Sequence, residues 1–331
     1  MRTAFIEELV RLAAQDERIW LVCGDLGYSV LEAFANRYPK RFLNAGVAEQ
    51  NMTGVAAGLA MMGKIVFTYS IANFPVMRCL EQIRNDICYH NLSVKIVAVG
   101  GGLAYASHGY THHGVEDLAV MSALPNIAVA APADPVEARL VLQIIASRPG
   151  PAYLRLGKAG EPVLHQPKVA IAYGKSIVAR DGHSLTLIST GGMLANTLAA
   201  CDKLEDSGYS VRVVSMPFIV PLDEDTILSA ITETGVILTI EEHGFGGLGT
   251  AVGECIARSG GATVFVPLRL ERSPIRTAGS QEQLRASQGL HVRGIVDSAM
   301  DACRRRSARP AGMKGDDNVG GRVDLQIPPL R

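Results

Sequence analysis

The sequence predicts an α/β protein with two doubly wound domains, each built on a mainly parallel sheet. Short continuous runs of Val, Ile, Leu and Ala alternate along the chain with longer segments whose apolar residues have helical spacing. Strands that are apolar on both faces are typical of parallel sheets covered by helices on both sides. The length of 331 residues favours two domains, each large enough to bury a core of its own.

The first domain is expected over residues 1–160. We expect strands where the apolar runs are short and continuous, and helices where apolar residues recur every three or four positions. The expected strands are residues 19–23, 64–69, 94–99, 127–131 and 152–155. The expected helices are residues 3–16, a segment beginning at Glu49, and residues 78–87, 115–121 and 134–146.

Residues 161–182 have a looser pattern, so we expect a linker there. The second domain is expected over residues 183–303. Its expected strands are residues 185–188, 211–214, 236–240 and 263–266, and its helices are expected to begin near Met193, Asp223, Leu248 and Leu290. Residues 304–331 are rich in charge and glycine, which predicts a disordered or loosely docked tail.

The composition argues against several classes of protein. The 32 basic and 32 acidic residues balance, so no bulk charge favours a nucleic acid or a membrane surface as partner. No apolar run reaches the roughly 18 residues of a membrane helix, and acids near the N-terminus argue against a signal peptide. The six cysteines form no CxxC pair and are expected to be reduced thiols in a cytoplasmic protein, without a metal site.

The most informative stretch runs from Asn44 to Met52 and leads into a helix of small residues that ends near Gly63. If Glu49 belongs to this helix, Met52 and Ala56 lie on the same face. Glu49 is then either exposed at the first turn, where the helix dipole favours a negative charge, or buried with a raised pKa and able to transfer a proton. Exposed acids are the commoner case, and this stretch alone leaves both alternatives open.

Loops that follow the strands of an open parallel sheet are where ligands bind. Residues 24–29 lack the glycine spacing of a dinucleotide loop and are better interpreted as a turn. In residues 69–75, Tyr69 and Phe74 could sandwich a flat heterocycle or be core aromatics. Arg155, at the end of another strand, suits an anionic substrate group or a surface ion pair.

A glycine-rich loop over residues 100–114 contains three of the eight histidines, His108, His112 and His113. Their spacing matches no structural zinc pattern, and the nearby acids Glu116 and Asp117 are expected to cap the next helix. We therefore favour polar substrate contacts over a metal site for these histidines.

Five segments together resemble the C-terminal half of a transketolase that exists as a separate subunit. They occur in the order and at the spacing of that family, over residues 1–303. The segments are residues 44–52, 110–119, 124–126, 132–134 and 241–252.

The resemblance implies a pyrimidine-binding domain, a transketolase C-terminal domain and thiamine diphosphate as cofactor. It implies that Glu49 hydrogen-bonds the aminopyrimidine and so promotes deprotonation of the thiazolium carbon, which needs an acid in a dry site. It places the ring that stacks on the pyrimidine at either Tyr69 or Phe74, with Ile71 as a further cofactor contact.

The resemblance also implies that His112 is catalytic. Together with Ser29, His108 and Arg155, and less directly Arg2, it is implied to contact the substrate. Two positions depart from the family pattern: His108 stands in place of an aspartate that contacts a substrate hydroxyl, and Gly100 in place of a histidine that helps to hold a phosphate.

Part of the family's cofactor site is missing from this chain. Family members hold the diphosphate through Mg²⁺ or Ca²⁺ bound by a Gly-Asp-Gly motif and a later asparagine, whereas here Leu26 follows Gly24 and Asp25, and Asn44 comes too early. The resemblance therefore implies an N-terminal partner subunit that binds the diphosphate and provides most of the ligands of the metal, in an α2β2 complex. Small residues after Glu49 would permit close packing against a neighbour, namely Gly54, Ala56, Ala57, Gly58 and Ala60.

The activity implied is transfer of a two-carbon ketol unit from a ketose donor to an aldehyde acceptor, with sugars or sugar phosphates as substrates. The alternatives are an E1β-type subunit of a 2-oxoacid dehydrogenase and a carboligase similar to deoxyxylulose-phosphate synthase. A regulatory module without cofactor is disfavoured because Glu49 and His112 are both retained.

Overall fold

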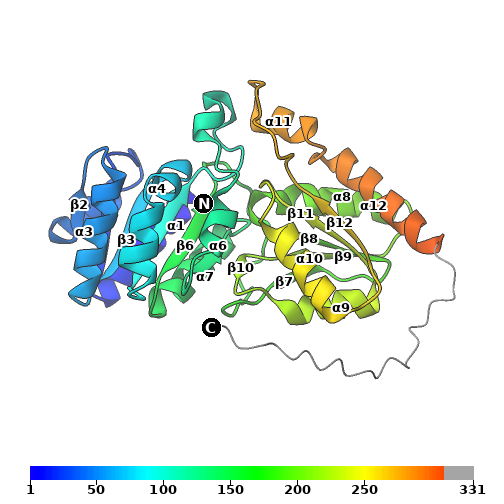
Figure 1. The fold of residues 1–331 in the computed structure, drawn as a ribbon, viewed down its shortest axis with the longest axis horizontal. Coiled ribbons are helices and arrows are strands. Elements are labelled where there is room, and N and C mark those ends of the chain that lie inside the picture. The colour runs from blue at the N-terminus through cyan, green and yellow to red at the C-terminus, as the bar shows by residue number, and fades with distance from the viewer. Residues whose placement is uncertain (309–331) are drawn as a thin grey trace, which may run out of the picture.

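The computed structural model describes residues 1–308 and shows two sheets lying side by side, each flanked by helices (Figure 1). The first sheet has seven strands in the order β10-β5-β6-β4-β3-β1-β2. Its strands are β1 (Ile19–Cys23), β2 (Phe42–Asn44), β3 (Ile65–Ile71), β4 (Val94–Val99), β5 (Ala128–Ala130), β6 (Ala152–Leu156) and β10 (Phe218–Val220). All neighbouring strands in it are parallel except β10 and β5, as expected for a doubly wound sheet with an added edge strand.

Helices cover both faces of the first sheet. On one face, α1 and α7 pack together over a core that includes Phe5, Phe67 and Leu142. On the other face, α3 and the helices after β3 enclose a core that includes Met52 and Val66. These helices are α1 (Arg2–Gln15), α2 (Glu32–Arg37), α3 (Glu49–Met61), α4 (Asn73–Met77), α5 (Leu80–Gln82), α6 (Asp117–Ser122) and α7 (Pro135–Ser147).

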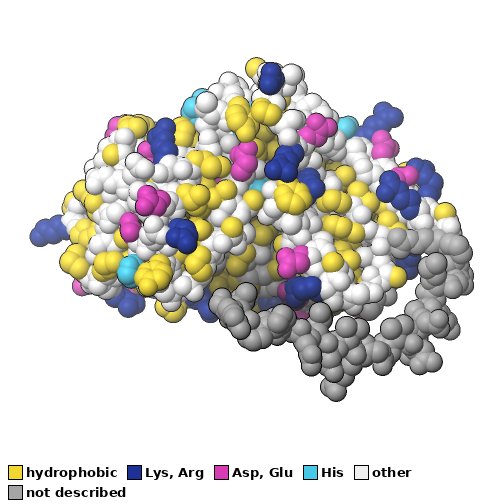
Figure 2. Space-filling model, in the orientation of Figure 1, with side chains coloured by type: hydrophobic (Ala, Val, Ile, Leu, Met, Phe, Trp, Pro, Cys, Tyr) yellow, Lys and Arg dark blue, Asp and Glu magenta, His cyan; other side chains and the backbone are white. Residues whose placement is uncertain are grey.

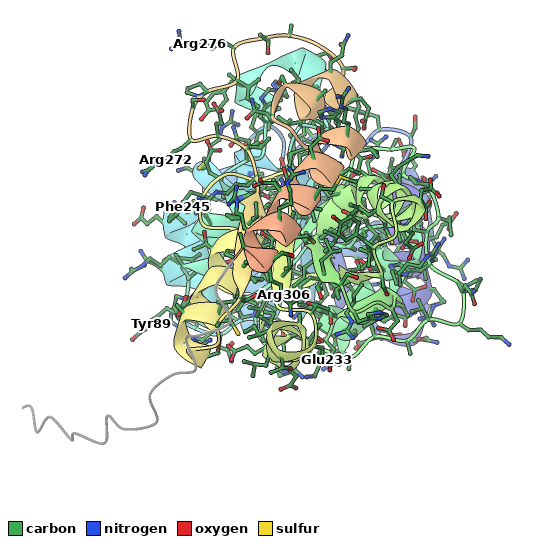
Figure 3. The ribbon with its side chains drawn as sticks, turned by 90° about the vertical axis from the view of Figure 1, so that its right-hand side faces the viewer. Tyr89, Glu233, Phe245, Arg272, Arg276 and Arg306 are labelled. Atoms are coloured by element: carbon green, nitrogen blue, oxygen red, sulfur yellow. The ribbon has the colours of Figure 1, made fainter. Side chains whose placement is uncertain are left out.

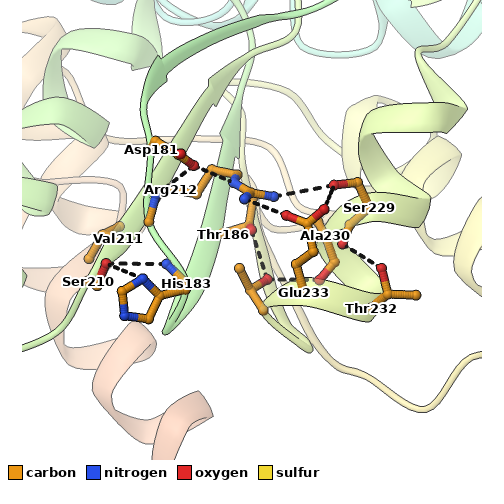
Figure 4. A network of polar contacts seen from close by, with 12 residues as sticks. Asp181, His183, Thr186, Ser210, Val211, Arg212, Ser229, Ala230, Thr232 and Glu233 are labelled. Atoms are coloured by element: carbon orange, nitrogen blue, oxygen red, sulfur yellow. Dashed lines mark hydrogen bonds and ion pairs between the residues drawn. The ribbon is translucent and has the colours of Figure 1, made fainter.

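The second sheet has five strands in the order β12-β11-β8-β9-β7, with only β7 antiparallel to its neighbour. Its strands are β7 (Ile177–Arg180), β8 (Leu185–Ser189), β9 (Val211–Ser215), β11 (Val236–Ile240) and β12 (Val264–Leu268). The helices of this half are α8 (Leu194–Asp206), α9 (Glu224–Glu233), α10 (Leu248–Ser259), α11 (Gln281–Ser287) and α12 (Val292–Ser307). Arg212 on β9 ties β7 and α9 together through Asp181 and Glu233 (Figure 4).

The two halves share buried contacts. Strand β10 belongs to the second half of the chain, yet Phe218 pairs with Ala130 at the edge of the first sheet. One apolar core also runs through both halves, because Val66 of the first sheet and Val214 of the second belong to the same cluster of buried residues. We conclude that the halves are fixed to one another by backbone pairing as well as by side-chain packing.

The expected fold class is confirmed, and the bounds of most expected elements agree with the structure to within a few residues. The helix expected over residues 78–87 begins at Leu80 and consists of α5 followed by a π-helical turn, η2 (Ile83–Cys88), while α4 precedes it and was not expected. Cys79, with φ of −110° and ψ of 11°, bends the chain between α4 and α5. Elements that were not expected are short or lie in loops, namely α2, α11, β2, β7 and β10.

Strand β7 lies inside the stretch expected as a linker, residues 161–182. Helix α12 continues to Ser307, so the tail expected from Arg304 begins as helix. The remainder of that predicted tail lies outside the described residues. All six cysteines are free, and all but Cys303 are buried.

Surface properties agree with the balanced composition. Figure 2 shows acidic, basic and hydrophobic side chains mixed over the visible face of the described chain. In residues 1–308, no helix is both long enough and apolar enough to cross a lipid bilayer.

A buried lysine joins β4 to the turn before β6. The side chain of Lys95 is buried, and its Nζ donates to the carbonyl oxygens of Arg148 at 2.9 Å and Gly150 at 2.5 Å. Burial, with a smaller contribution from the charge of Arg148, lowers the pKa of Lys95 to about 7. The folded protein thus releases a proton that the unfolded chain, with a lysine pKa of about 10.4, still holds at pH 8 or 9.

We expect Lys95 to make stability depend on pH. Between pH 7 and pH 10 the unfolded chain binds more protons at this site, so the free energy of unfolding should rise with pH, by up to about 1.4 kcal/mol per pH unit. Lys95→Met should abolish this contribution, so that the difference in unfolding free energy between wild type and variant changes from pH 7 to pH 9. Denaturant unfolding at both values measures it, with Lys40→Met, at an exposed lysine, as control. An equal difference at both pH values would contradict the prediction.

Candidate active site

The polar loops after β1, β3, β4 and β6 converge at one edge of the first sheet, close to the start of α3. Glu49 is the first residue of α3 and is only 3% exposed. Its carboxylate therefore lies at the positive end of the helix dipole and is also buried. The alternative of an exposed acid is therefore wrong: Glu49 is buried at the first turn of α3, and Met52 and Ala56 are buried on the same helix face.

Among residues 1–308, Glu49 has one charged partner, Arg78. The Nη1 of Arg78 donates to Oε2 of Glu49 at 2.9 Å, and the Oγ of Ser70 lies 3.4 Å from Oε1. Arg78 is 51% exposed, so the ion pair opens to solvent on the arginine side only. Gly24 packs against the carboxylate, since a Cβ there would lie 3.6 Å from the Cγ of Glu49.

Asp25 and Asn44 bind one another. The Nδ2 of Asn44 donates to Oδ1 of Asp25 at 2.8 Å, and the backbone N of Asp25 donates to Oδ1 of Asn44 at 3.1 Å. Oδ1 of Asn44 also accepts from the backbone N of Gly46 at 3.0 Å. These contacts brace the turn before α3. In residues 1–308, no group of three or more His, Cys, Asp or Glu side chains is placed to hold a metal ion.

The two candidate aromatics lie in different surroundings. Tyr69 is 1% exposed, its ring stacks on Phe5 with centroids 5.9 Å apart, and burial raises the pKa of its hydroxyl. Phe74 is partly exposed, and the guanidinium carbon of Arg78 lies 4.5 Å from its ring centre. A cavity of about 520 Å³ adjoins Phe74 and Arg78. Of the two rings, Phe74 is therefore the one that borders a cavity and is partly open to solvent, and Ile71 is the last residue of β3.

The histidine loop is closed at its base by backbone hydrogen bonds between Gly102 and Gly114. Two 3-10 turns, η3 (Ala106–His108) and η4 (Tyr110–His112), project from this base. The rings of His108 and His112 are 5.2 Å apart, and His112 meets Phe74 edge-on at 5.3 Å. The structure thus brings His108, His112 and Phe74 together.

His113 is buried, in contrast to its two neighbours. Partial burial lowers the pKa of His112, and the positive charges that His108 and His113 can acquire lower it further. At neutral pH His112 is accordingly a neutral imidazole that can donate and accept a hydrogen bond.

Arg155 is a buried residue between the two halves. Its Nη2 donates to the carbonyl oxygens of Gly114 at 2.6 Å and Glu242 at 2.9 Å, and its Nε lies 3.2 Å from Oδ2 of Asp117. Tyr153 also donates to Asp117, at 2.6 Å. The expectation that Glu116 and Asp117 cap α6 through their side chains is wrong: neither caps it, and Asp117 points to Tyr153 and Arg155 instead.

The sequence did not single out His243 and Glu242 as site residues, although both lie in a recognised segment. Nε2 of His243 accepts from the backbone N of Leu118 at 3.1 Å, so this histidine takes the place of a side-chain cap on α6. Burial lowers the pKa of His243 to about 4, which keeps it neutral. Glu242 pairs with Nε of Arg285 at 2.9 Å. In the sequence, the only signal for these contacts of Glu242 and His243 is the run of charged and polar residues at the start of the glycine-rich segment 241–252.

Ser29 and Arg2 are two further residues that were expected to contact the substrate. Ser29 is exposed in a left-handed conformation (φ 62°), and its backbone N donates to Glu32 at 2.9 Å. Arg2 is partly buried at the start of α1, and its buried Nε has no hydrogen-bond partner.

Comparisons with known proteins identify two domains. Residues 1–160 match the transketolase pyrimidine-binding domain, and residues 174–295 match the transketolase C-terminal domain. The chain is 36% identical to one of the subunits of the apulose-4-phosphate transketolase of Phocaeicola vulgatus, over 92% of this chain and 97% of that one. It is 33% identical to the 6-deoxy-6-sulfo-D-fructose transketolase subunit SqwH of a Clostridium species, over 93% and 96%. It also matches 1-deoxy-D-xylulose-5-phosphate synthase of Desulforudis audaxviator at 33% identity, but spans only 48% of that enzyme.

Solved structures agree with this result. A chain described as "Split gene transketolase, inactive beta4 tetramer" superposes with a TM-score of 0.84 at 36% identity, over 92% of this chain and 97% of that one. The transketolase of Campylobacter jejuni has the same fold at 19% identity and a TM-score of 0.77, and the chain spans 46% of it. The chain therefore belongs to the transketolase family, in which it corresponds to the separate subunit of a split enzyme that contains the pyrimidine-binding and C-terminal domains.

Proposed function

We propose that this subunit activates thiamine diphosphate in a two-subunit transketolase and that Glu49 is the activating acid. The observation that supports this most directly is a carboxylate that is 3% exposed at the start of α3, within reach of a partly exposed aromatic ring. Such a carboxylate can hydrogen-bond a ring nitrogen of an aminopyrimidine in a site of low polarity. When bound, thiamine diphosphate supplies the nucleophilic carbon and the electron sink needed to move a two-carbon ketol unit.

Phe74, rather than Tyr69, is proposed to stack on the pyrimidine, with Ile71 beside it. The Tyr69 ring is enclosed by Phe5 and the core of the first domain, so no ligand face is free. Phe74 borders a cavity of about 520 Å³ and already has a planar cation over its ring. A flat heterocycle fits the same place for the same reasons.

His112 and His108 are proposed to contact the substrate beside the cofactor. His112 lies between Phe74 and His108, so it adjoins both the proposed pyrimidine site and the open end of the loop. A neutral imidazole there can hydrogen-bond a hydroxyl or carbonyl oxygen of a sugar and relay a proton. Ser29 is proposed to contact the substrate at the rim, whereas Arg155 supports the loop from below through Gly114.

We propose that a partner subunit binds the diphosphate and its Mg²⁺ or Ca²⁺, in an α2β2 complex. Asp25 and Asn44 satisfy one another here, which supports a metal site located elsewhere. One side of α3 is open for a partner: a Cβ on Gly54 or Gly58 would meet nothing within 4 Å, and Met61 is 58% exposed. Apolar exposure of this kind is typical of a subunit interface.

The relatives are named for sugar substrates that bear an anionic group, apulose 4-phosphate in one case and 6-deoxy-6-sulfo-D-fructose in the other. We propose that the donor or acceptor of this enzyme is likewise a ketose or aldehyde with a phosphate or sulfonate.

Replacing Glu49 with Gln should nearly abolish turnover by the reconstituted complex. The amide keeps the shape of the side chain but cannot exchange a proton, so kcat should fall by about 10² to 10⁴. Steady-state kinetics measure this, and size-exclusion chromatography checks that the complex still assembles. Glu81→Gln, at an exposed glutamate on α5, is the matched control. Wild-type turnover by the Glu49→Gln complex would refute the assignment.

The isolated chain should bind thiamine diphosphate at least about 100-fold more weakly than the assembled complex, because the diphosphate and metal contacts come from the partner. Calorimetric titration of the cofactor in the presence of Mg²⁺, into the chain alone and into the complex, compares the two affinities. Equally tight, magnesium-dependent binding by the chain alone would contradict the proposed division of the site.

A further inference from the structure

Helix α11 of the second half lies against the histidine loop. Figure 1 shows the two segments side by side at the top of the view, and α11 contacts η3, the turn that ends at His108. Leu284 of α11 is buried in the same apolar cluster as Leu103 and Ala106 of the loop. A displacement of α11 would therefore shift the turn that bears His108.

A buried ion pair fixes α11 to the segment that follows β11. Arg285 and Glu242 are each 7% exposed, and the Nε and Nη2 of Arg285 donate to the two carboxylate oxygens of Glu242 at 2.9 and 3.2 Å. The Nε2 of Gln281 donates to the same two oxygens, at 3.0 Å each. In residues 1–308, Glu242 forms no other ion pair, so Arg285 supplies the charge that its burial requires.

The carboxylate of Glu242 also lies directly against the base of the histidine loop. A Cβ added to Gly102 would lie 2.6 Å from Oε2 of Glu242, too close to fit without movement. Gly102 exchanges backbone hydrogen bonds of 2.7 and 3.1 Å with Gly114, and these bonds close the loop. The ion pair therefore holds α11 and also fills the space beside the closure of the loop.

The loop needs such support because its own sequence restrains it little. Five of residues 100–114 are glycines, which leave the backbone many accessible conformations. His108 is exposed and His112 is partly exposed, on the two turns beyond the closure. Their positions consequently depend on where the base of the loop and η3 are attached.

We propose that Arg285 is a positioning residue of the active site. Paired with Glu242, it holds α11 and the base of the histidine loop in one arrangement and so sets where His108 and His112 meet the substrate. The guanidinium of Arg285 faces Glu242 and Glu282, so its effect on the reaction is exerted through the loop. The inference rests on the proposed function for the roles of the two histidines, whereas its effect on the loop is measured without turnover.

Hydrogen exchange of the assembled complex, with thiamine diphosphate and Mg²⁺ but without sugar, tests the loop directly. Arg285→Met keeps a side chain of similar length but leaves the buried Glu242 without a cation, so peptides covering residues 100–114 should exchange about tenfold faster or more. Arg285→Lys retains a cation and should restore most of the protection. Arg293→Met, at an exposed arginine of α12 that pairs with Asp297, is the matched control and should exchange as wild type.

Gln281→Ala provides a second test in case Arg285→Met does not assemble. It removes the amide hydrogen bonds to Glu242 but leaves the ion pair in place, so the complex should form and the same peptides should exchange about threefold faster. Wild-type exchange of residues 100–114 in Arg285→Met, or in Gln281→Ala if Arg285→Met does not assemble, refutes the inference.

Kinetics connect the loop to the reaction. In Arg285→Met, kcat/KM for the ketose D-xylulose 5-phosphate should fall about 10- to 100-fold, because misplaced contact groups stabilise the transition state less well. The Kd of thiamine diphosphate, measured by calorimetry, should stay within about threefold of wild type, because Glu49 and Phe74 lie outside the loop. Arg285→Lys should recover most of the lost kcat/KM.

The outcomes separate positioning from general loosening and from failure of the proposed function. An equal loss of cofactor affinity in Arg285→Met, or a wild-type kcat/KM despite faster loop exchange, refutes the positioning role. If the wild-type complex turns over no ketose while loop exchange still depends on Arg285, the proposed function fails and the support of the loop by Arg285 stands.

Discussion

The ion pair between Glu49 and Arg78 is the interaction on which the geometry of the site depends. Burying a charged carboxylate costs free energy of folding unless the charge is paired, and Glu49 is only 3% exposed. Its stabilising contacts are the guanidinium of Arg78, the more distant hydroxyl of Ser70 and the N-terminus of α3. The requirement accounts for one local feature: the chain bends at Cys79, next to Arg78, between α4 and α5. The same segment positions Phe74 under Arg78, so the acid, its partner and the exposed ring are placed by one bend of the backbone.

The second half of the chain determines the position of the histidine loop. Arg155 binds carbonyl oxygens from both halves, at Gly114 and Glu242, and His243 accepts from the backbone at the start of α6. These contacts are buried, so removing the Arg155 side chain would leave the buried Asp117 without its guanidinium partner, at a cost of about 3 to 5 kcal/mol. A loop with five glycines over residues 100–114 has little packing of its own. The C-terminal domain, visible beside this loop in Figure 1, therefore acts as its support. Phe245 and Arg272 of the same domain line a cavity with Tyr110 and Glu116, and Figure 3 shows Phe245, Arg272 and Arg276 on one side of that domain.

Much of this fold follows from periodicity in the sequence, because buried parallel strands and amphipathic helices have distinct patterns. Strand β1 and the start of α3 were predicted to the residue. Strand β10 could not be predicted, because it has only three residues and pairs with β5, which is distant in the sequence, so no local pattern marks it. The site residues likewise fall into those that local sequence motifs locate and those that depend on tertiary contacts. Glu49 and His112 could be located from motifs, whereas the choice between Tyr69 and Phe74 depends on which ring the core encloses. Asp117 was taken for a helix cap because its tertiary partners, Tyr153 and Arg155, are distant in sequence.

The unequal exposure of the two members of the central ion pair has a consequence for ligand binding. Glu49 is enclosed and cannot leave its position without moving α3, whereas half of the Arg78 surface already contacts water. Water can therefore replace Glu49 as the partner of Arg78 at small cost to the arginine, whereas the buried carboxylate needs a new partner when Arg78 leaves. A flat ligand that hydrogen-bonds Glu49 and stacks on Phe74 would take over both contacts that Arg78 makes. The acid is thus a fixed element of the site and its partner a replaceable one. We infer that Arg78 keeps the buried carboxylate paired until a ligand arrives.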